Sequence, residues 1–237
     1  MVEWSQSWAP AYHAGYVANT AGLGVFPMRA KLTAGSTREI DVDWLKRHFA
    51  DAPASAEPVY GDQDARPEAA TLRAAAVLVP IIARPDELTI LFTQRTAHLK
   101  AHSGQISFPG GRLEEGDESA EAAALRETHE EIGLAPAYVQ VLGRLADYHT
   151  RTGFRVTPVV GVLTPPFDLT LDAYEVEEAF EVPLSFLLDP SNHQRHSREF
   201  QGRTVHYYAI PYRDHYIWGA TAGMLVNLYR HLAAAKR

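Results

Sequence analysis

The fold of this chain is predicted by a glycine-rich loop that leads into a glutamate-rich segment. Residues 110–134 read GGRLEEGDESAEAAALRETHEEIGL. Asp117 or Ser119 can cap the start of a helix, and Gly133 is the small residue that helix C-caps favour. The segment therefore predicts a loop–helix–loop unit whose helix ends at Ile132.

Three carboxylates fall on one face of this predicted helix. Glu127, Glu130 and Glu131 stand at i, i+3 and i+4, and residues at these separations are neighbours on a helix. Their like charges repel, and a hard divalent cation removes that conflict, because Mg²⁺ prefers carboxylate oxygens, water and phosphate. The preceding glycines let a backbone approach closely. The whole segment thus predicts a metal–phosphate site.

The other side of the same helix is predicted to pack on a core. Leu125, His129 and Ile132 share that side. A glutamate-rich helix on its own is ordinarily a solvated surface. Here the Gly-Gly loop, the Arg-Glu pair, the Glu-Glu pair and the closing Gly occur together in order, and this combination favours the functional interpretation.

The composition is that of an ordinary globular protein and narrows the classes of function. The 237 residues include 22 Lys and Arg against 29 Asp and Glu, which gives a net charge of −7, and 46% are hydrophobic. This excludes a mostly disordered chain and disfavours an electrostatic binder of nucleic acid or acidic membranes. Cysteine is absent, which excludes disulfides, Cys-ligated metals and a Cys nucleophile. No membrane span or secretory signal is evident, so we expect a cytoplasmic protein.

The chain is predicted to have two parts. Residues 1–70 form an N-terminal extension with a short helix over 36–50, where apolar residues recur at helical spacing, and a Pro- and Gly-rich linker over 51–70. Residues 71–237 form the main body. Its predicted strands span 72–82, 88–93, 138–145, 156–163 and 204–210, its predicted helices 183–188 and 221–235, and a structured loop 101–116. This mixture favours an α/β or α+β fold with a mixed sheet.

The loop–helix segment resembles the Nudix box, in which a Gly and an acid precede Arg-Glu-x-x-Glu-Glu-x-Gly. The matching residues are Gly111, Arg126, Glu127, Glu130, Glu131 and Gly133. The resemblance implies an α/β/α sandwich with a mixed sheet, whose loop–helix–loop binds Mg²⁺ or Mn²⁺ and cleaves diphosphates linked to another moiety. Asp117 and Glu118 compete for the acidic position, which in the family pairs with the motif arginine, and Thr128 stands at an apolar position.

A second signature lies just upstream and narrows the resemblance to one branch. Residues 91–111 read LFTQRTAHLKAHSGQISFPGG and look like the extra motif of coenzyme A diphosphatases. Arg95, Gly104 and residues 108–111 match, whereas Thr96 replaces the usual Ser or Ala and Lys100 replaces the usual Arg. Lys keeps the charge but loses the bidentate fork of Arg. The resemblance also includes residues 175–184 and 217–222, and so runs from about residue 72 to the end.

The resemblance implies roles for the acidic residues. We expect Glu127 and Glu131 to be direct metal ligands, since i and i+4 point the same way. Glu130 is then a third ligand or the base that activates water. The family often places its base on a loop across the site, for which Glu175 and Glu178 are the candidates.

The resemblance also implies a substrate and a set of binding residues. Arg95 and Lys100 would hold phosphates beside Gly110 and Gly111, and coenzyme A would yield 4′-phosphopantetheine and adenosine 3′,5′-bisphosphate. One alternative is a Nudix enzyme for ADP-ribose, a dinucleotide or a nucleoside triphosphate. Another is a non-catalytic nucleotide-binding regulator, which the retained carboxylates disfavour. A third assigns residues 1–70 to a dimer contact or a lid.

Overall fold

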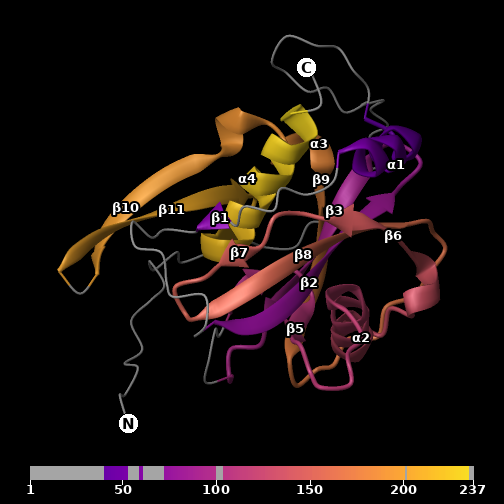
Figure 1. The fold of residues 1–237 in the computed structure, drawn as a ribbon, viewed down its shortest axis with the longest axis horizontal. Helices are drawn as coiled ribbons and strands as arrows, with labels where there is room; N and C mark the ends of the chain where they lie inside the picture. Colours follow the sequence, from indigo (N-terminus) through magenta and orange to yellow (C-terminus); the bar gives the residue numbers. More distant parts are fainter. Residues whose placement is uncertain (1–39, 53–58, 61–71, 100–103, 201, 235–237) are drawn as a thin grey trace, which may run out of the picture.

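The computed structural model describes residues 40–52, 59–60, 72–99, 104–200 and 202–234. Within them a nine-stranded mixed sheet forms the body, and a separate three-stranded sheet lies beside it (Figure 1). The strands of the large sheet are β1 (Val59–Tyr60), β2 (Arg73–Ala83), β3 (Leu88–Arg95), β4 (Ile106–Ser107), β5 (Gly110–Arg112), β6 (Val139–Arg144), β7 (Tyr148–His149), β8 (Phe154–Leu163) and β9 (Val176–Pro183).

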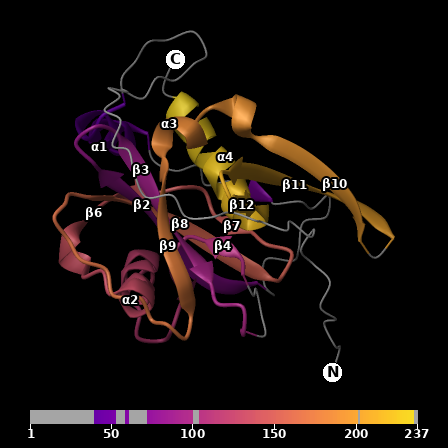
Figure 2. The ribbon, with the colours of Figure 1, turned by 180° about the vertical axis from the view of Figure 1, so that it is seen from behind.

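The centre of the large sheet is the long strand β2. It runs parallel to β8 from Arg73 to Ile82, and it forms an antiparallel hairpin with β3 and a second antiparallel pair with β5. Because a central strand is covered on both faces, its sequence is almost continuously apolar. The other edge of β3 pairs with β9, which Figure 2 shows from behind. The predicted strands at 72–82, 88–93, 138–145 and 156–163 are confirmed by β2, β3, β6 and β8.

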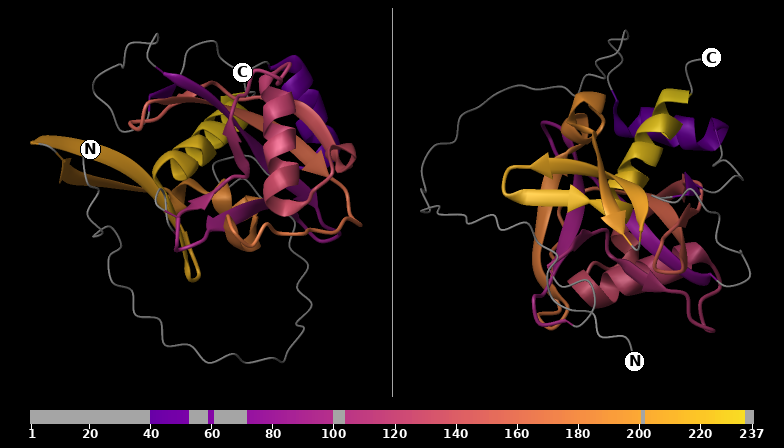
Figure 3. Two further views of the ribbon diagram at one scale, coloured as in Figure 1. Left: turned by 90° about the horizontal axis from the view of Figure 1, so that it is seen from below. Right: turned by 90° about the vertical axis from the view of Figure 1, so that its left-hand side faces the viewer.

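Helices cover both faces of the sheet. The helix α2 (Ala120–Ile132) packs on one face, where its alanines contact Ala76, Leu78 and Val159. The helices α1 (Val42–Asp51) and α4 (Gly219–Ala234), with the short α3 (Leu184–Leu187), pack on the opposite face around the largest core cluster (Figure 3). The predicted α/β/α sandwich is thus confirmed. No helix among the described residues is long and apolar enough to cross a membrane.

The helix predicted within the N-terminal extension is present as α1. The Asp41 carboxylate accepts a hydrogen bond from the Trp44 N–H at 2.7 Å and caps the helix. Leu45 and Phe49 are buried in the same core cluster as residues of the body. Most of residues 1–70 lie outside the described residues, so the division at residue 70 stays a prediction.

Some elements of the structure were not predicted. The segment 101–116, predicted as a loop, contains β4 and β5, and β9 was not predicted as a strand. Among the described residues, the second sheet contains β10 (Gln194–Phe200), β11 (Arg203–Tyr212) and β12 (His215–Trp218), of which the sequence predicted only residues 204–210 within β11. A strand is recognised in sequence by alternating apolar and polar residues. The polar strand β10 has no such alternation, because it is held by pairing with β11 rather than by a buried face of its own.

The prediction of which residues of α2 face the core was wrong in part. Ile132 is buried as expected, but His129 is exposed and Leu125 is only half-buried. The side that faces the sheet consists of Ala120, Ala123, Ala124, Thr128, Glu131 and Ile132. The helix packs on the sheet through its smallest residues, which brings the glutamate side next to the sheet instead of away from it.

We expect Leu45→Ala to destabilise the whole described body and not α1 alone. Leu45 is 0% exposed and lies in the main core cluster, so the lost contacts and the cavity cost about 2–5 kcal/mol. Urea denaturation followed by tryptophan fluorescence and far-UV circular dichroism checks this. A matched change at the exposed Asp43 should leave the midpoint unchanged, and two separate transitions in the Ala variant would contradict the expectation.

Candidate functional site

The ends of α2 are fixed by local hydrogen bonds. The Ser119 hydroxyl accepts a hydrogen bond from the Ala122 N–H at 3.1 Å, so Ser119 is the N-cap. At the other end Gly133 has φ 70°, and a Cβ there would lie 2.9 Å from Thr170. A left-handed C-cap against another chain segment requires Gly. The predicted C-terminal end is confirmed, and of the two N-caps that the sequence allowed, Asp117 and Ser119, the structure has Ser119.

The guanidinium of Arg126 ties the loop to the helix. Its Nε and Nη2 atoms donate to the two carboxylate oxygens of Asp117 at 3.1 and 2.9 Å, and Nη2 also donates to the Arg112 carbonyl at 3.2 Å. These bonds hold the pKa of Asp117 below its usual value. Asp117 and not the exposed Glu118 therefore pairs with the motif arginine.

The same guanidinium also holds two of the three predicted metal ligands. Arg126 Nη1 donates to Glu127 Oε1 and to Glu130 Oε2, both at 3.1 Å. Glu127 is half-buried, whereas the Glu130 side chain is 56% exposed. Burial raises the pKa of Glu127 despite the nearby Arg126. The structure thus brings Glu127 and Glu130 together, with only Glu127 turned toward the sheet.

Glu131 is the most buried carboxylate of the group. It is 7% exposed, and its Oε2 accepts a hydrogen bond from the Gly110 N–H at 3.2 Å. Burial raises the pKa of Glu131 to about 7, although the Gly110 bond and the Arg95 charge act in the opposite direction. The charges of Glu175 and Glu127 raise this pKa further. The carboxyl group is therefore poised to lose its proton near neutral pH.

The two glycines of the loop let the backbone of β5 touch both buried carboxylates. A Cβ on Gly111 would lie 2.4 Å from the Glu127 carboxylate carbon. Gly110 has φ 151°, and a Cβ there would lie 2.4 Å from the Ala76 carbonyl oxygen. Both positions therefore exclude side chains, because a Cβ at these distances overlaps other atoms.

Arg95 and Glu175 complete the site from the other end of the sheet. Arg95 Nη1 lies 3.5 Å from Glu131 Oε1, and Arg95 Nη2 lies 3.6 Å from Glu175 Oε2. Glu178, the second candidate base, instead pairs with His215 Nε2 at 3.2 Å. The structure brings Arg95, Glu131 and Glu175 together and places Glu178 with a different partner. Lys100 lies outside the described residues.

The donor set fits a hard divalent cation that keeps open positions. Among the described residues no three His, Cys, Asp or Glu side chains form a preformed metal cage. Mg²⁺ commonly uses one or two carboxylates and completes its shell with water and substrate phosphate. Glu131 and Glu127 would supply two oxygen ligands on one side of α2, and each lies against the glycine loop. These two residues are the best-placed ligands.

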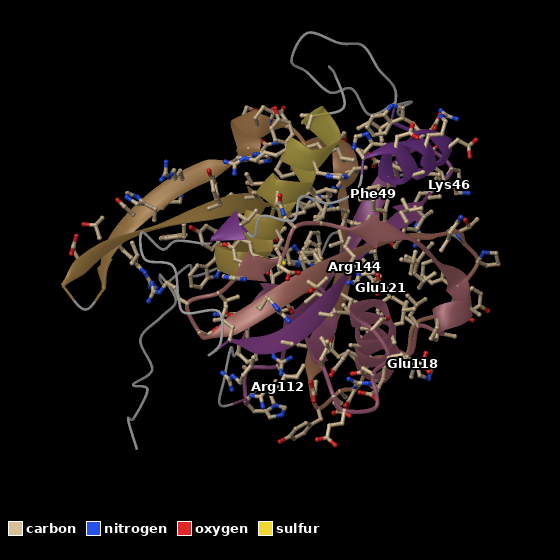
Figure 4. The ribbon with its side chains drawn as sticks, in the orientation of Figure 1. Lys46, Phe49, Arg112, Glu118, Glu121 and Arg144 are labelled. Carbon is tan, nitrogen blue, oxygen red and sulfur yellow. The ribbon has the colours of Figure 1, made fainter. Side chains whose placement is uncertain are left out.

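An ion pair outside the site helps to position α2, and two arginines lie on the surface near the loop. The Arg144 guanidinium on β6 forms a two-armed ion pair with Glu121, which fixes the helix from its far side (Figure 4). The sequence did not single out Arg112, whose exposed side chain lies with Arg73 against the ring of Phe154. In the sequence, the position of Arg112 directly after Gly111 was the feature that could have pointed to it.

The chain is similar in sequence and in fold to several known proteins. The sequence pattern of the NUDIX domain matches residues 72–201. Nudix hydrolase NudL of Escherichia coli strain K12 is 40% identical over 156 residues, which cover 66% of this chain and 81% of the relative. NudL of Photorhabdus laumondii is 43% identical over 156 residues, which cover 66% of this chain and 83% of that relative. A solved MutT/nudix family protein from Enterococcus faecalis matches with a TM-score of 0.45 and 18% identity, over 73% of this chain and 66% of that one.

We expect Glu131→Gln to stabilise the metal-free protein at pH 8.5 and to change little at pH 5. A raised pKa means that the folded state binds the proton more tightly than the unfolded chain, so stability falls as pH rises from about 4.5 through about 7. The shift corresponds to a gain of up to about 3 kcal/mol for the neutral Gln. Urea denaturation with EDTA at both pH values measures it. An equal effect at both would contradict the buried-charge interpretation.

We expect Gly111→Ala to weaken binding of Mn²⁺ by about 10- to 100-fold, because the new Cβ displaces the Glu127 carboxylate. Gly116→Ala is the matched control, since a Cβ there meets no atom within 4 Å. Titration of free Mn²⁺ by electron paramagnetic resonance gives both affinities. Unchanged binding in Gly111→Ala would show that Glu127 is not a ligand.

Proposed function

The chain belongs to the NUDIX-domain family and is a Nudix diphosphatase, and we propose that its substrate is coenzyme A or one of its derivatives. The proposed reaction hydrolyses the diphosphate bond with Mg²⁺ or Mn²⁺ and releases 4′-phosphopantetheine and adenosine 3′,5′-bisphosphate. We place this reaction in the cytoplasm, with a small molecule as the partner and neither nucleic acid nor membrane involved.

One observation carries the choice of substrate. Arg95 belongs to the signature that resembles coenzyme A diphosphatases, and Glu131 belongs to the Nudix box. Their side chains lie 3.5 Å apart. Gly110, at the end of the same signature, also contacts this carboxylate, since its N–H donates to Glu131 Oε2. The upstream signature is therefore part of the site that would receive the diphosphate, which supports a role in choosing the substrate.

The proposed roles follow from where each side chain lies. Glu127 and Glu131 would hold the metal ion, with Glu130 at the exposed margin as a third ligand or a base. A bound ion supplies charge neutralisation for the phosphate oxygens and lowers the pKa of a bound water. Arg95 would bind a phosphate oxygen, because a guanidinium can donate two parallel hydrogen bonds. Lys100, Gly110 and Gly111 would complete the phosphate contacts.

The base that accepts the proton of the attacking water is also assigned from position. Glu175 lies across Arg95 from Glu131, so it borders the site and is our first candidate. Glu178 is the second candidate, but its pair with His215 has to break before it can act. A comparison of pH–rate profiles of Glu175→Gln and Glu178→Gln separates the two, since loss of the base removes the acidic limb of the profile.

Mass-resolved product analysis tests the substrate. The purified protein is incubated with Mg²⁺ and, in parallel, coenzyme A, acetyl-coenzyme A, ADP-ribose, NADH and ATP. We expect 4′-phosphopantetheine, or its acetylated form, and adenosine 3′,5′-bisphosphate from the first two compounds alone. Cleavage of ADP-ribose or NADH instead would refute the substrate and keep the diphosphatase. Binding of these compounds without cleavage would favour a nucleotide-binding regulator.

We expect Glu131→Gln to lower kcat for coenzyme A by about 10²–10⁴-fold, because it removes a positioned carboxylate from the reacting centre. Glu118→Gln is the matched control, since Glu118 is exposed at the start of the same helix. Steady-state kinetics at saturating Mg²⁺, with circular dichroism to verify folding, decide the result. Near-normal turnover in the Glu131 variant would refute its assignment.

A further inference from the structure

Two arginines neutralise the acidic cluster, and they are held in different ways. Arg126 makes five hydrogen bonds, all between 2.9 and 3.2 Å, to three carboxylates and one carbonyl. Arg95 reaches its two carboxylates only at 3.5 and 3.6 Å. Distances near 2.9 Å mark a well-formed N–H···O bond, and those of Arg95 are longer. Arg126 is thus firmly held, whereas the Arg95 guanidinium makes two looser ion pairs within the described part of the chain.

The backbone of Arg95 is fixed while its side chain is accessible. Its N–H donates to the Gln105 carbonyl at 3.0 Å, and its carbonyl accepts from the Gly104 N–H at 3.1 Å. The side chain is 26% exposed, so it is open to solvent at the margin of the site. Because the backbone of Arg95 is fixed and its guanidinium is loosely held, the side chain can turn between two partners without any change in the sheet.

The formal charges show what happens when a divalent cation binds. Glu131 and Glu175 carry −2 when ionised and Arg95 carries +1, so this group is net negative. A divalent cation on Glu131 makes the group net positive and competes with Arg95 for the same carboxylate oxygens. The guanidinium then lies beside a like charge and lacks a full counter-charge, which a phosphate oxygen supplies.

We propose that Arg95 is an exchangeable counter-ion of the metal site. In the metal-free protein it neutralises Glu131 and Glu175, and binding of the divalent cation releases its guanidinium to bind a phosphate of the substrate. This rests on the proposed function, because it takes Glu131 as a metal ligand and a diphosphate as the substrate. Its consequence is an order of binding in which the cation comes first and creates the phosphate site.

Binding of Mn²⁺ to the full chain without substrate tests the proposal. Free Mn²⁺ is measured by electron paramagnetic resonance at pH 8.5. We expect Arg95→Met to bind Mn²⁺ about five- to tenfold more tightly than the wild type, because a competing cation is removed, and to raise KM for coenzyme A by about tenfold or more. Arg95→Gln repeats the test with a polar side chain if the Met variant does not fold.

Arg84→Met is the matched control. Arg84 follows β2 and pairs with Glu181 on β9, so its loss changes the net charge equally and also removes an arginine–glutamate pair. We expect its Mn²⁺ affinity to stay within about twofold of the wild type. Unchanged or weaker Mn²⁺ binding in Arg95→Met, with a normal control, would overturn the exchange while wild-type hydrolysis of coenzyme A would still support the proposed function. Tighter Mn²⁺ binding with ADP-ribose as the substrate would refute the coenzyme A proposal and keep the exchange.

Discussion

A carboxylate buried between a helix and a sheet is the constraint on which this molecule depends. Glu131 is almost completely removed from water, and its hydrogen bond comes from the Gly110 backbone. A buried charge is costly unless it is paired and hydrogen-bonded. The Gly110 N–H and the charge of Arg95 both reduce that cost. The result is a carboxyl group that is neutral or charged at nearly equal free energy around pH 7.

The different roles of Arg126 and Arg95 follow from this constraint. Arg126 joins Asp117 and the Arg112 carbonyl to the helix through its Nε and Nη2 donors. Arg95 comes from β3, on the other side of the site, and touches the acidic group only at its edge. One arginine therefore maintains the architecture, and the other is available to the chemistry.

Local interactions in this protein could be predicted from sequence, and long-range choices could not. The ends of α2 followed from Ser119 and Gly133, because a cap is formed within one turn of its helix. The choice between Asp117 and Glu118 needed the turn in which Asp117 also accepts the Glu114 N–H. The exposure of His129 and the pairing of Glu178 with His215 depended on elements distant in the chain. The spacing of the glutamates predicted their common edge, but not how deeply each one lies.

The alanines on the inner side of α2 set that depth. Ala120, Ala123 and Ala124 lie flat against β2 and β8, so the helix axis comes as close to the sheet as side chains allow. Any larger residue there would move the helix outward and carry Glu127 and Glu131 into water with it. Side-chain volume at three positions that touch no reactant therefore tunes the acidity of the site. A change in packing alone, with every charged residue left in place, would shift the pKa of Glu131.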